Sequence, residues 1–65
     1  MPKINGNDVP EAAGMTVKEY LLSKGYSLKL IAVELNGNIL PKAEYETYTI
    51  LEGDKLEVVT FVGGG

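Results

Sequence analysis

The chain of 65 residues can form one small domain, because a polypeptide of this size cannot bury a second hydrophobic core. It contains no cysteine, histidine or tryptophan, which excludes disulfides, zinc sites of the Cys/His kind, thiol nucleophiles and serine-histidine-aspartate catalysis. Nine acidic residues against six lysines, with no arginine, give a net charge of −3, so we expect neither a nucleic-acid nor a membrane partner.

The hydrophobic content of 45% is typical of a chain that folds. The longest apolar runs span only a handful of residues, which is too short to cross a bilayer. No apolar segment of the signal-peptide kind follows Met1-Pro2-Lys3. These features predict a cytoplasmic protein.

The first elements are a hairpin and a helix. Residues 2–11 are predicted to form a small hairpin, because Asn5-Gly6 readily supplies the two positive φ angles of a type I′ turn. A single amphipathic helix is expected at about 17–24. Thr16 and Glu19 stand in capping-box register at its start, just ahead of the apolar positions of the helix.

A second hairpin is expected after the helix. Residues 31–35 alternate apolar side chains with small or charged ones, which is the period of a half-buried strand. Asn36-Gly37 gives a second hairpin signal, and Ile39 and Leu40 begin the return strand. Pro41 ends this strand because proline cannot donate a hydrogen bond to a ladder.

The last third of the chain contains its strongest strand, at 55–61, where β-branched residues alternate with charged ones. Before it, a turn is expected at 51–54. The segment between the second hairpin and this turn carries no clean period. We predict a turn of helix near 42–45 and a short strand near 47–49.

This order of elements predicts an α+β fold, with a mixed sheet of four to five strands and one main helix packed across it. If the first and last strands are neighbours, they run parallel at the centre of the sheet, as in β-grasp (ubiquitin-like) folds. We expect one domain at 1–61, followed by a flexible C-terminal glycine tail at 62–65.

Alternation along the last strand separates a buried face from an open face. Leu56 and Val58 are predicted to lie under the helix, which places Val59 and Phe61 on the open face near the end of the strand. There they form an apolar spot that a partner could cover, together with Val62. The alternative is the opposite register, or a core that needs Val59 and Phe61 for itself.

The run of glycines at the end is the least ordinary feature of the sequence. Val62 to Gly65 can extend about 13–14 Å, with no side chain after Val62, so Gly63 and Gly64 could thread a narrow channel. The Gly65 carboxylate is unhindered but needs activation from outside, for instance by ATP, before acyl chemistry can occur. The chain would then be a substrate and not a catalyst. The alternative is a frayed end or an expression remnant.

The remaining polar and aromatic residues fit a solvated surface and a core. The acidic residues of the second half could steer a basic partner, but each is better explained as a solvated group, and their spacing fits no metal-binding loop; they are Glu44, Glu46, Glu52, Asp54 and Glu57. The tyrosines are expected in the core and strands and not as stacking platforms; they are Tyr20, Tyr26, Tyr45 and Tyr48.

Taken together, the residues resemble the ThiS family, the ubiquitin-like sulfur carriers of thiamin biosynthesis. The resemblance runs from end to end, and its specific part is the last strand block together with the terminal Gly64-Gly65. The matching blocks are Ile4-Asn5-Gly6, Thr16-Val17-Lys18-Glu19-Tyr20-Leu21-Leu22, Ala32-Val33-Glu34-Leu35-Asn36-Gly37 and Leu51-Glu52-Gly53-Asp54-Lys55-Leu56-Glu57-Val58-Val59. A third glycine and the segment from Glu44 to Thr49 depart from the family pattern.

The resemblance implies a specific chemistry for the terminal carboxylate. The Gly65 carboxylate would be adenylated with ATP by an E1-like adenylyltransferase and converted to a thiocarboxylate. The sulfur would come from a donor such as a cysteine desulfurase relay and would pass to a thiazole synthase. By this analogy the chain has no catalytic residue, no metal and no bound cofactor.

Two other interpretations stay open at this point. The related carriers of molybdopterin synthesis share the ending and the chemistry but generally have longer chains. A ubiquitin-like protein modifier or binding module would use the same fold with a different fate for the tail. An enzyme is the weakest interpretation, because the sequence offers no nucleophile with a base beside it.

Overall fold

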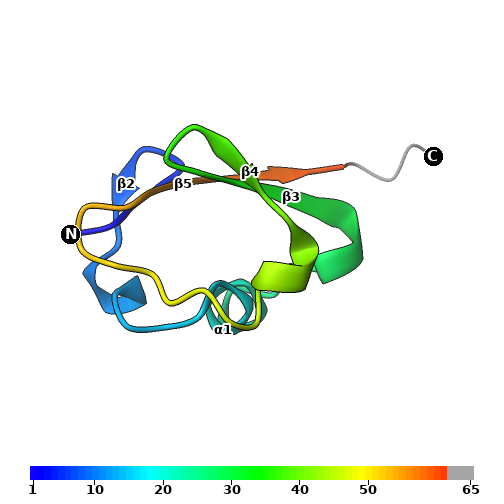
Figure 1. Ribbon diagram of the computed structural model, residues 1–65, viewed down its shortest axis with the longest axis horizontal. Coiled ribbons are helices and arrows are strands. Elements are labelled where there is room, and N and C mark those ends of the chain that lie inside the picture. The colour runs from blue at the N-terminus through cyan, green and yellow to red at the C-terminus, as the bar shows by residue number, and fades with distance from the viewer. Residues whose placement is uncertain (62–65) are drawn as a thin grey trace.

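The computed structural model describes residues 1–61, which form a five-stranded sheet with one α-helix below it (Figure 1). Within these residues no helix has the length and apolar character needed to cross a bilayer. The elements are β1 (Lys3–Ile4), β2 (Asn7–Asp8), α1 (Val17–Ser23), β3 (Ile31–Leu35), β4 (Asn38–Leu40) and β5 (Lys55–Thr60), with short 3-10 helices at Pro10–Ala12, Leu28–Leu30 and Lys42–Glu44.

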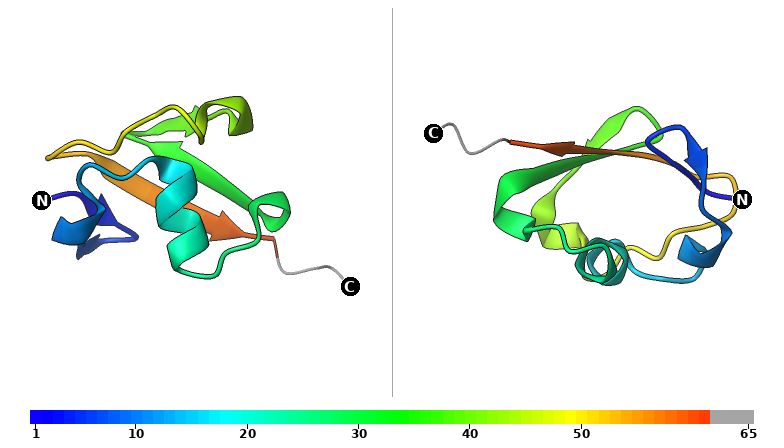
Figure 2. Two further views of the ribbon diagram at one scale, coloured as in Figure 1. Left: turned by 90° about the horizontal axis from the view of Figure 1, so that it is seen from below. Right: turned by 180° about the vertical axis from the view of Figure 1, so that it is seen from behind.

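The strand order is β2-β1-β5-β3-β4, so the last strand in the sequence is the central strand of the sheet. β5 runs parallel to β1 and antiparallel to β3, and both outer pairs are antiparallel hairpins. Seen from below, α1 crosses the sheet (Figure 2). The α+β prediction, with parallel first and last strands at the centre, is therefore confirmed.

Both predicted hairpin turns are present. Asn5 and Gly6 have φ angles of 52° and 84°, and Asn36 and Gly37 have φ angles of 51° and 88°. Two successive positive φ angles are the mark of a type I′ turn, whose twist matches that of the strands it joins. The first hairpin is shorter than the predicted 2–11, because a 3-10 helix begins at Pro10.

The predicted capping box starts the helix. The Glu19 backbone N–H donates to Thr16 Oγ1 at 3.1 Å, and the Thr16 N–H donates to Glu19 Oε1 at 2.9 Å. Each bond satisfies a donor that the helix itself leaves free. The helix occupies Val17–Ser23, within the predicted range of about 17–24.

The core lies between α1 and one face of the sheet. It joins Val17, Tyr20 and Leu21 of the helix to Ile31, Val33, Leu56 and Val58 of the two central strands. Tyr20 and Tyr45 are buried, and Tyr26 and Tyr48 pack against the core from its edge. The predicted packing of the tyrosines in the core is confirmed, but their predicted place in strands is wrong, since Tyr20 lies in α1 and the other three lie between the named strands.

The predicted strand at 47–49 is wrong. Thr49 forms only an isolated bridge with Thr16, while the N–H of Tyr48 turns back to the Glu44 carbonyl. The segment instead offers its carbonyl groups to the start of the helix: Val17 N–H donates to Tyr48 O at 3.0 Å, and Lys18 N–H donates to Tyr45 O at 2.8 Å. Because the first N–H groups of a helix have no partner within it, this segment acts as a second cap.

Asp54 is buried, with 7% of its surface exposed, which corrects the expectation of a solvated carboxylate. It accepts hydrogen bonds from Tyr48 Oη at 2.7 Å, from the Leu51 N–H at 2.9 Å and from Asn36 Nδ2 at 3.0 Å. Burial by itself raises the pKa of Asp54, but the hydrogen bonds from Leu51, Asn36 and Tyr48 outweigh it and hold the pKa below its usual value. Asp54 therefore ties the turn before β5 to both the Tyr48 segment and the second hairpin.

The two faces of β5 are expected to differ in their sensitivity to truncation. Leu56→Ala should lower the free energy of unfolding by about 2–5 kcal/mol, because it opens a cavity where the side chain is 1% exposed. Val59→Ala, on the opposite face and 50% exposed, should lower it by less than about 1 kcal/mol. Urea unfolding of both variants measures this difference, and equal losses would contradict the assignment of faces.

Asp54 is expected to make stability depend on pH in the acid range. Because its folded-state pKa is lowered from an unfolded value of about 3.9, the ionised group stabilises the fold above that pH, and this stability is lost as the pH falls through the folded pKa. Asp54→Asn should be less stable at neutral pH by about 1–3 kcal/mol and should lose stability less steeply below about pH 4. Urea unfolding at a series of pH values tests this, with Glu46→Gln as the control that removes a carboxylate from an exposed position.

Candidate functional site

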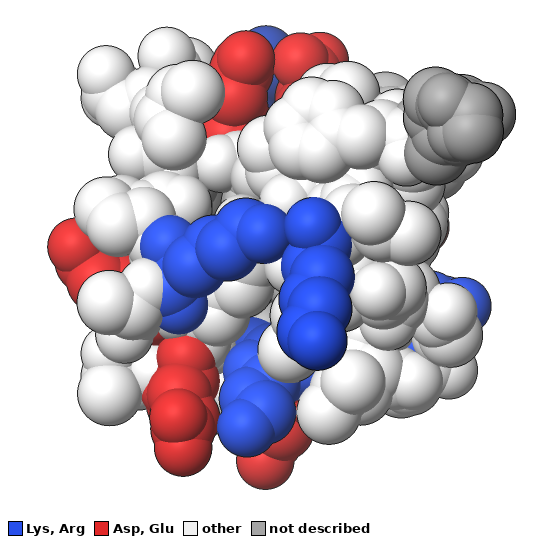
Figure 3. Space-filling view, turned by 90° about the vertical axis from the view of Figure 1, so that its right-hand side faces the viewer, with Lys and Arg blue, Asp and Glu red and all other residues white. Residues whose placement is uncertain are grey.

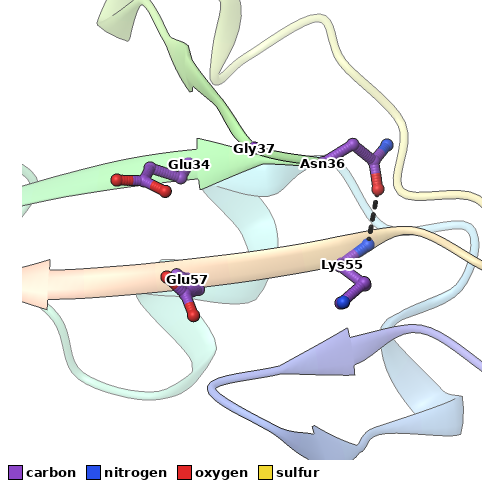
Figure 4. Close-up of a pocket in the computed structure, with 5 residues that line it drawn as sticks. All are labelled: Glu34, Asn36, Gly37, Lys55 and Glu57. Carbon is purple, nitrogen blue, oxygen red and sulfur yellow. Dashed lines mark hydrogen bonds between the residues drawn. The ribbon is translucent and has the colours of Figure 1, made fainter.

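Strand β5 leads to the end of the chain, and the two asparagine turns hold it from both sides. The Asn5 backbone N–H donates to Leu56 O at 2.9 Å, and Asn5 Oδ1 accepts from the Val58 N–H at 2.8 Å. On the other side, the Asn36 N–H donates to Lys55 O at 2.7 Å, and Asn36 Oδ1 accepts from the Lys55 N–H at 2.9 Å (Figure 4). The turn residues therefore position the central strand as well as reversing the chain.

A further backbone bond holds the end of the described chain. The Phe61 N–H donates to Leu30 O at 2.7 Å, just beyond the last residue of β5. The position of residue 61 is thus tied to the 3-10 helix that precedes β3. The predicted tail residues Val62, Gly63, Gly64 and Gly65 lie outside the described residues.

The open face of the sheet carries the predicted apolar spot. Val59 is 50% exposed and Phe61 is 54% exposed, whereas Leu56 and Val58 are buried under α1. The opposite register is thereby excluded. Ile39, which is 70% exposed, extends the apolar surface of this face on β4, because its partner Glu34 faces outward as well.

The same face also carries two carboxylates that lie directly across from each other. The register of β3 and β5 pairs Glu34 with Glu57, and both line a hollow together with Asn36, Gly37 and Lys55 (Figure 4). Sequence reasoning singled out Glu57 among the acids and missed Glu34. The available signal was its place in the alternation of residues 31–35, two positions from Ala32 on the outward face.

The end of the molecule at which β5 finishes carries charges of both signs. Lysine side chains cross the middle of this end, and acidic side chains lie along its upper and lower margins (Figure 3). Among residues 1–61, no group of three acidic side chains is placed to hold a metal ion. Neither sign of charge dominates this end of the molecule.

Known proteins match this chain along nearly its whole length. The thiazole synthase of Paramagnetospirillum magneticum is 44% identical over 62 residues, which are 95% of this chain. The sulfur carrier protein ThiS of Bacillus subtilis is 35% identical over 66 residues, spanning all of both chains. The chain covers only 19% of the length of the thiazole synthases it matches, so it corresponds to one segment of those proteins.

A solved structure shows the same fold. The crystal structure of the thiamine biosynthesis protein ThiS from Geobacter metallireducens superposes with a TM-score of 0.76 at 33% identity, covering 98% of this chain and 97% of that one. The ThiS family pattern itself matches residues 3–65 and so includes the terminal glycines. On the evidence of sheet order, relatives and family pattern together, the chain belongs to the ThiS family.

Proposed function

We propose that the chain is a sulfur carrier of thiamin biosynthesis, which is charged with sulfur at the Gly65 carboxylate and delivers it to a thiazole synthase. The observation that carries this proposal is the match to the ThiS family through the last residue, Gly65. The sulfur carrier of Bacillus subtilis, which aligns over its whole length, supports the same role. The carrier is a cosubstrate of other enzymes in this proposal and has no active site of its own.

The proposed charging uses ATP bound by an E1-like adenylyltransferase and not by the carrier. A Gly65 carboxylate oxygen attacks the α-phosphate of ATP and displaces pyrophosphate, which leaves an acyl adenylate. The terminal sulfur of a persulfide, from a donor such as a cysteine desulfurase relay, then attacks the carbonyl carbon and displaces AMP, which gives an acyl disulfide. A second thiol attacks the donor sulfur of this S–S bond and forms a new disulfide with the donor. The product that is released is a thiocarboxylate in which one sulfur has replaced one oxygen.

Glycine suits this chemistry for a steric reason. With no Cβ on Gly63, Gly64 or Gly65, nothing beside the carbonyl carbon obstructs attack, and a channel only wide enough for a backbone can admit the segment. Residues 62–65 can reach about 13–14 Å when extended. The globular part then stays outside the channel, where Val59, Phe61 and Val62 would contact the rim.

Thiazole synthase as the acceptor of sulfur is supported by the relatives. Two proteins named thiazole synthase contain a segment similar to 95% of this chain, so the carrier-like part and the rest share one polypeptide there. Joining two interacting modules in one chain raises their effective concentration. We infer that a thiazole synthase is also the partner to which this chain delivers its sulfur.

Charging is expected to raise the intact mass by the difference between one sulfur and one oxygen atom. The chain is incubated with ATP, the activating enzyme and the sulfur donor, and mass spectrometry then locates the change in the C-terminal peptide containing Gly65. A variant lacking Gly64-Gly65 should gain nothing, because the reacting carboxylate no longer reaches the nucleotide. An unchanged mass of the full chain with a competent activating enzyme would refute the sulfur-carrier function.

The apolar spot is expected to matter for charging but not for folding. Phe61→Ala should slow sulfur loading several-fold through a higher Michaelis constant, because it removes apolar contact with the activating enzyme. Leu22→Ala is the matched control, since Leu22 is also 54% exposed but lies on α1. The two variants are compared in loading rate and in urea unfolding, and an equal effect on loading would remove Phe61 from the docking surface.

A further inference from the structure

Two like charges face each other at the middle of the open face. Glu34 and Glu57 are directly opposite in the antiparallel pair of β3 and β5, on the side of the sheet away from α1. Side chains so placed have Cβ atoms about 4.5–5.5 Å apart, and like charges at that separation destabilise a sheet. Among residues 1–61, no ion pair includes either carboxylate. The free chain therefore keeps an electrostatic cost at this position.

Neither neighbouring lysine forms an ion pair with the two carboxylates within residues 1–61. Lys55 lines the same hollow and lies two residues before Glu57 on the same face of β5 (Figure 4), but its ammonium group is not paired with either carboxylate. Lys3, which pairs with Lys55 in the sheet register, is bound to Asp8 at 2.9 Å. The two carboxylates thus remain available to a cation from outside.

Apolar side chains border the two carboxylates on two sides. Ile39 lies opposite Glu34 on β4, and Val59 follows Glu57 on the same face of β5, beside Ala32. Ile39 and Val59 are both at least half exposed. A charged centre with an apolar border fits a partner surface that offers one basic side chain among apolar ones.

We propose that the open face docks on thiazole synthase, and that a lysine or arginine of that enzyme is placed between Glu34 and Glu57. This proposal rests on the proposed sulfur-carrier function, which makes thiazole synthase the acceptor. Arginine fits best, because its planar guanidinium has enough donors to bond both carboxylates at once. The net charge of −3 favours the approach of such a basic surface.

The register of β5 sets where the basic side chain must lie on the partner. Glu57 and Phe61 are four residues apart on the same face, which corresponds to about 13 Å along a strand. Phe61 lies next to the start of the tail. The basic side chain of the synthase is therefore expected about 13 Å from the mouth of the channel that takes the tail.

Removal of one of the two charges should have opposite effects on folding and on binding. In the free chain, Glu57→Gln relieves the repulsion with Glu34, so the midpoint of urea unfolding should rise. In the complex it removes one acceptor from the basic side chain, so the dissociation constant for thiazole synthase should rise by roughly tenfold. A variant that merely damaged the fold would lower the unfolding midpoint instead.

The experiment measures urea unfolding and calorimetric binding to the thiazole synthase of the same organism for the wild type and two variants. Glu57→Gln is compared with Glu46→Gln, which removes the same charge from an exposed position in the segment that caps α1, on the other side of the sheet. Both variants lose one negative charge, so general electrostatic attraction changes equally in the two. Because Glu46 lies outside the proposed docking face, the control should bind within about twofold of the wild type.

Three results would overturn the proposal: wild-type binding by Glu57→Gln, equal weakening by the two variants, or a lower unfolding midpoint for Glu57→Gln. The mass measurement on the same preparations keeps this separate from the proposed function. If the wild type gains sulfur but Glu57→Gln binds normally, the sulfur-carrier function stands and only the proposed docking surface is refuted. A wild-type chain that gains no sulfur fails as a carrier.

Discussion

Hydrogen bonds from the asparagines of two hairpin turns, Asn5 and Asn36, fix the position of the central strand β5 in the sheet. β5 shares five residue pairs with β3 but only two with β1, so bonds outside the ladders add most on the side of the first hairpin. Asn5 adds a backbone and a side-chain bond on that side, and Asn36 does the same on the side of β3. Both asparagines adopt the left-handed backbone conformation of a type I′ turn. Each therefore lies at the end of a hairpin, where its side chain can bond β5.

One strand therefore serves the core and the open face at once. A chain of this size can form only one hydrophobic core, and α1 covers one side of the sheet. The alternation of β5 sends Leu56 and Val58 to the helix, and leaves Glu57 and Val59 on the other side. Because both sets lie on one backbone, the packing that stabilises the domain also fixes the geometry of the surface offered to partners.

The carboxylates of the chain show how position decides the role of one functional group. Asp54 is buried, and three hydrogen bonds make it part of the framework before β5. Glu52, two residues earlier, is exposed and pairs with the N-terminal ammonium group at 2.6 Å. Glu34 and Glu57 have neither kind of partner within residues 1–61, and it is this difference that makes them the candidates for recognition by another protein.

Local sequence signals were sufficient for the hairpin turns, the capping box and the strong last strand, because each depends on residues within a few positions of one another. The faces of β5 also followed from alternation once a helix had been assigned to cover it. The segment at 47–49 was mispredicted, because its carbonyl groups bond a helix start about thirty positions away. No local pattern encodes such a contact.

The sequence by itself thus determined the class of fold, the family resemblance and the apolar residues near the tail, since these reside in short motifs and periodicity. Only the tertiary structure decided that Asp54 is buried and that Glu34 faces Glu57. Both facts depend on strand register and on chain segments brought together from distant positions, such as Asn36 and Asp54. Hydrogen bonds across the sheet, and not the identity of neighbouring residues, determine which acids are enclosed and which are left opposite one another.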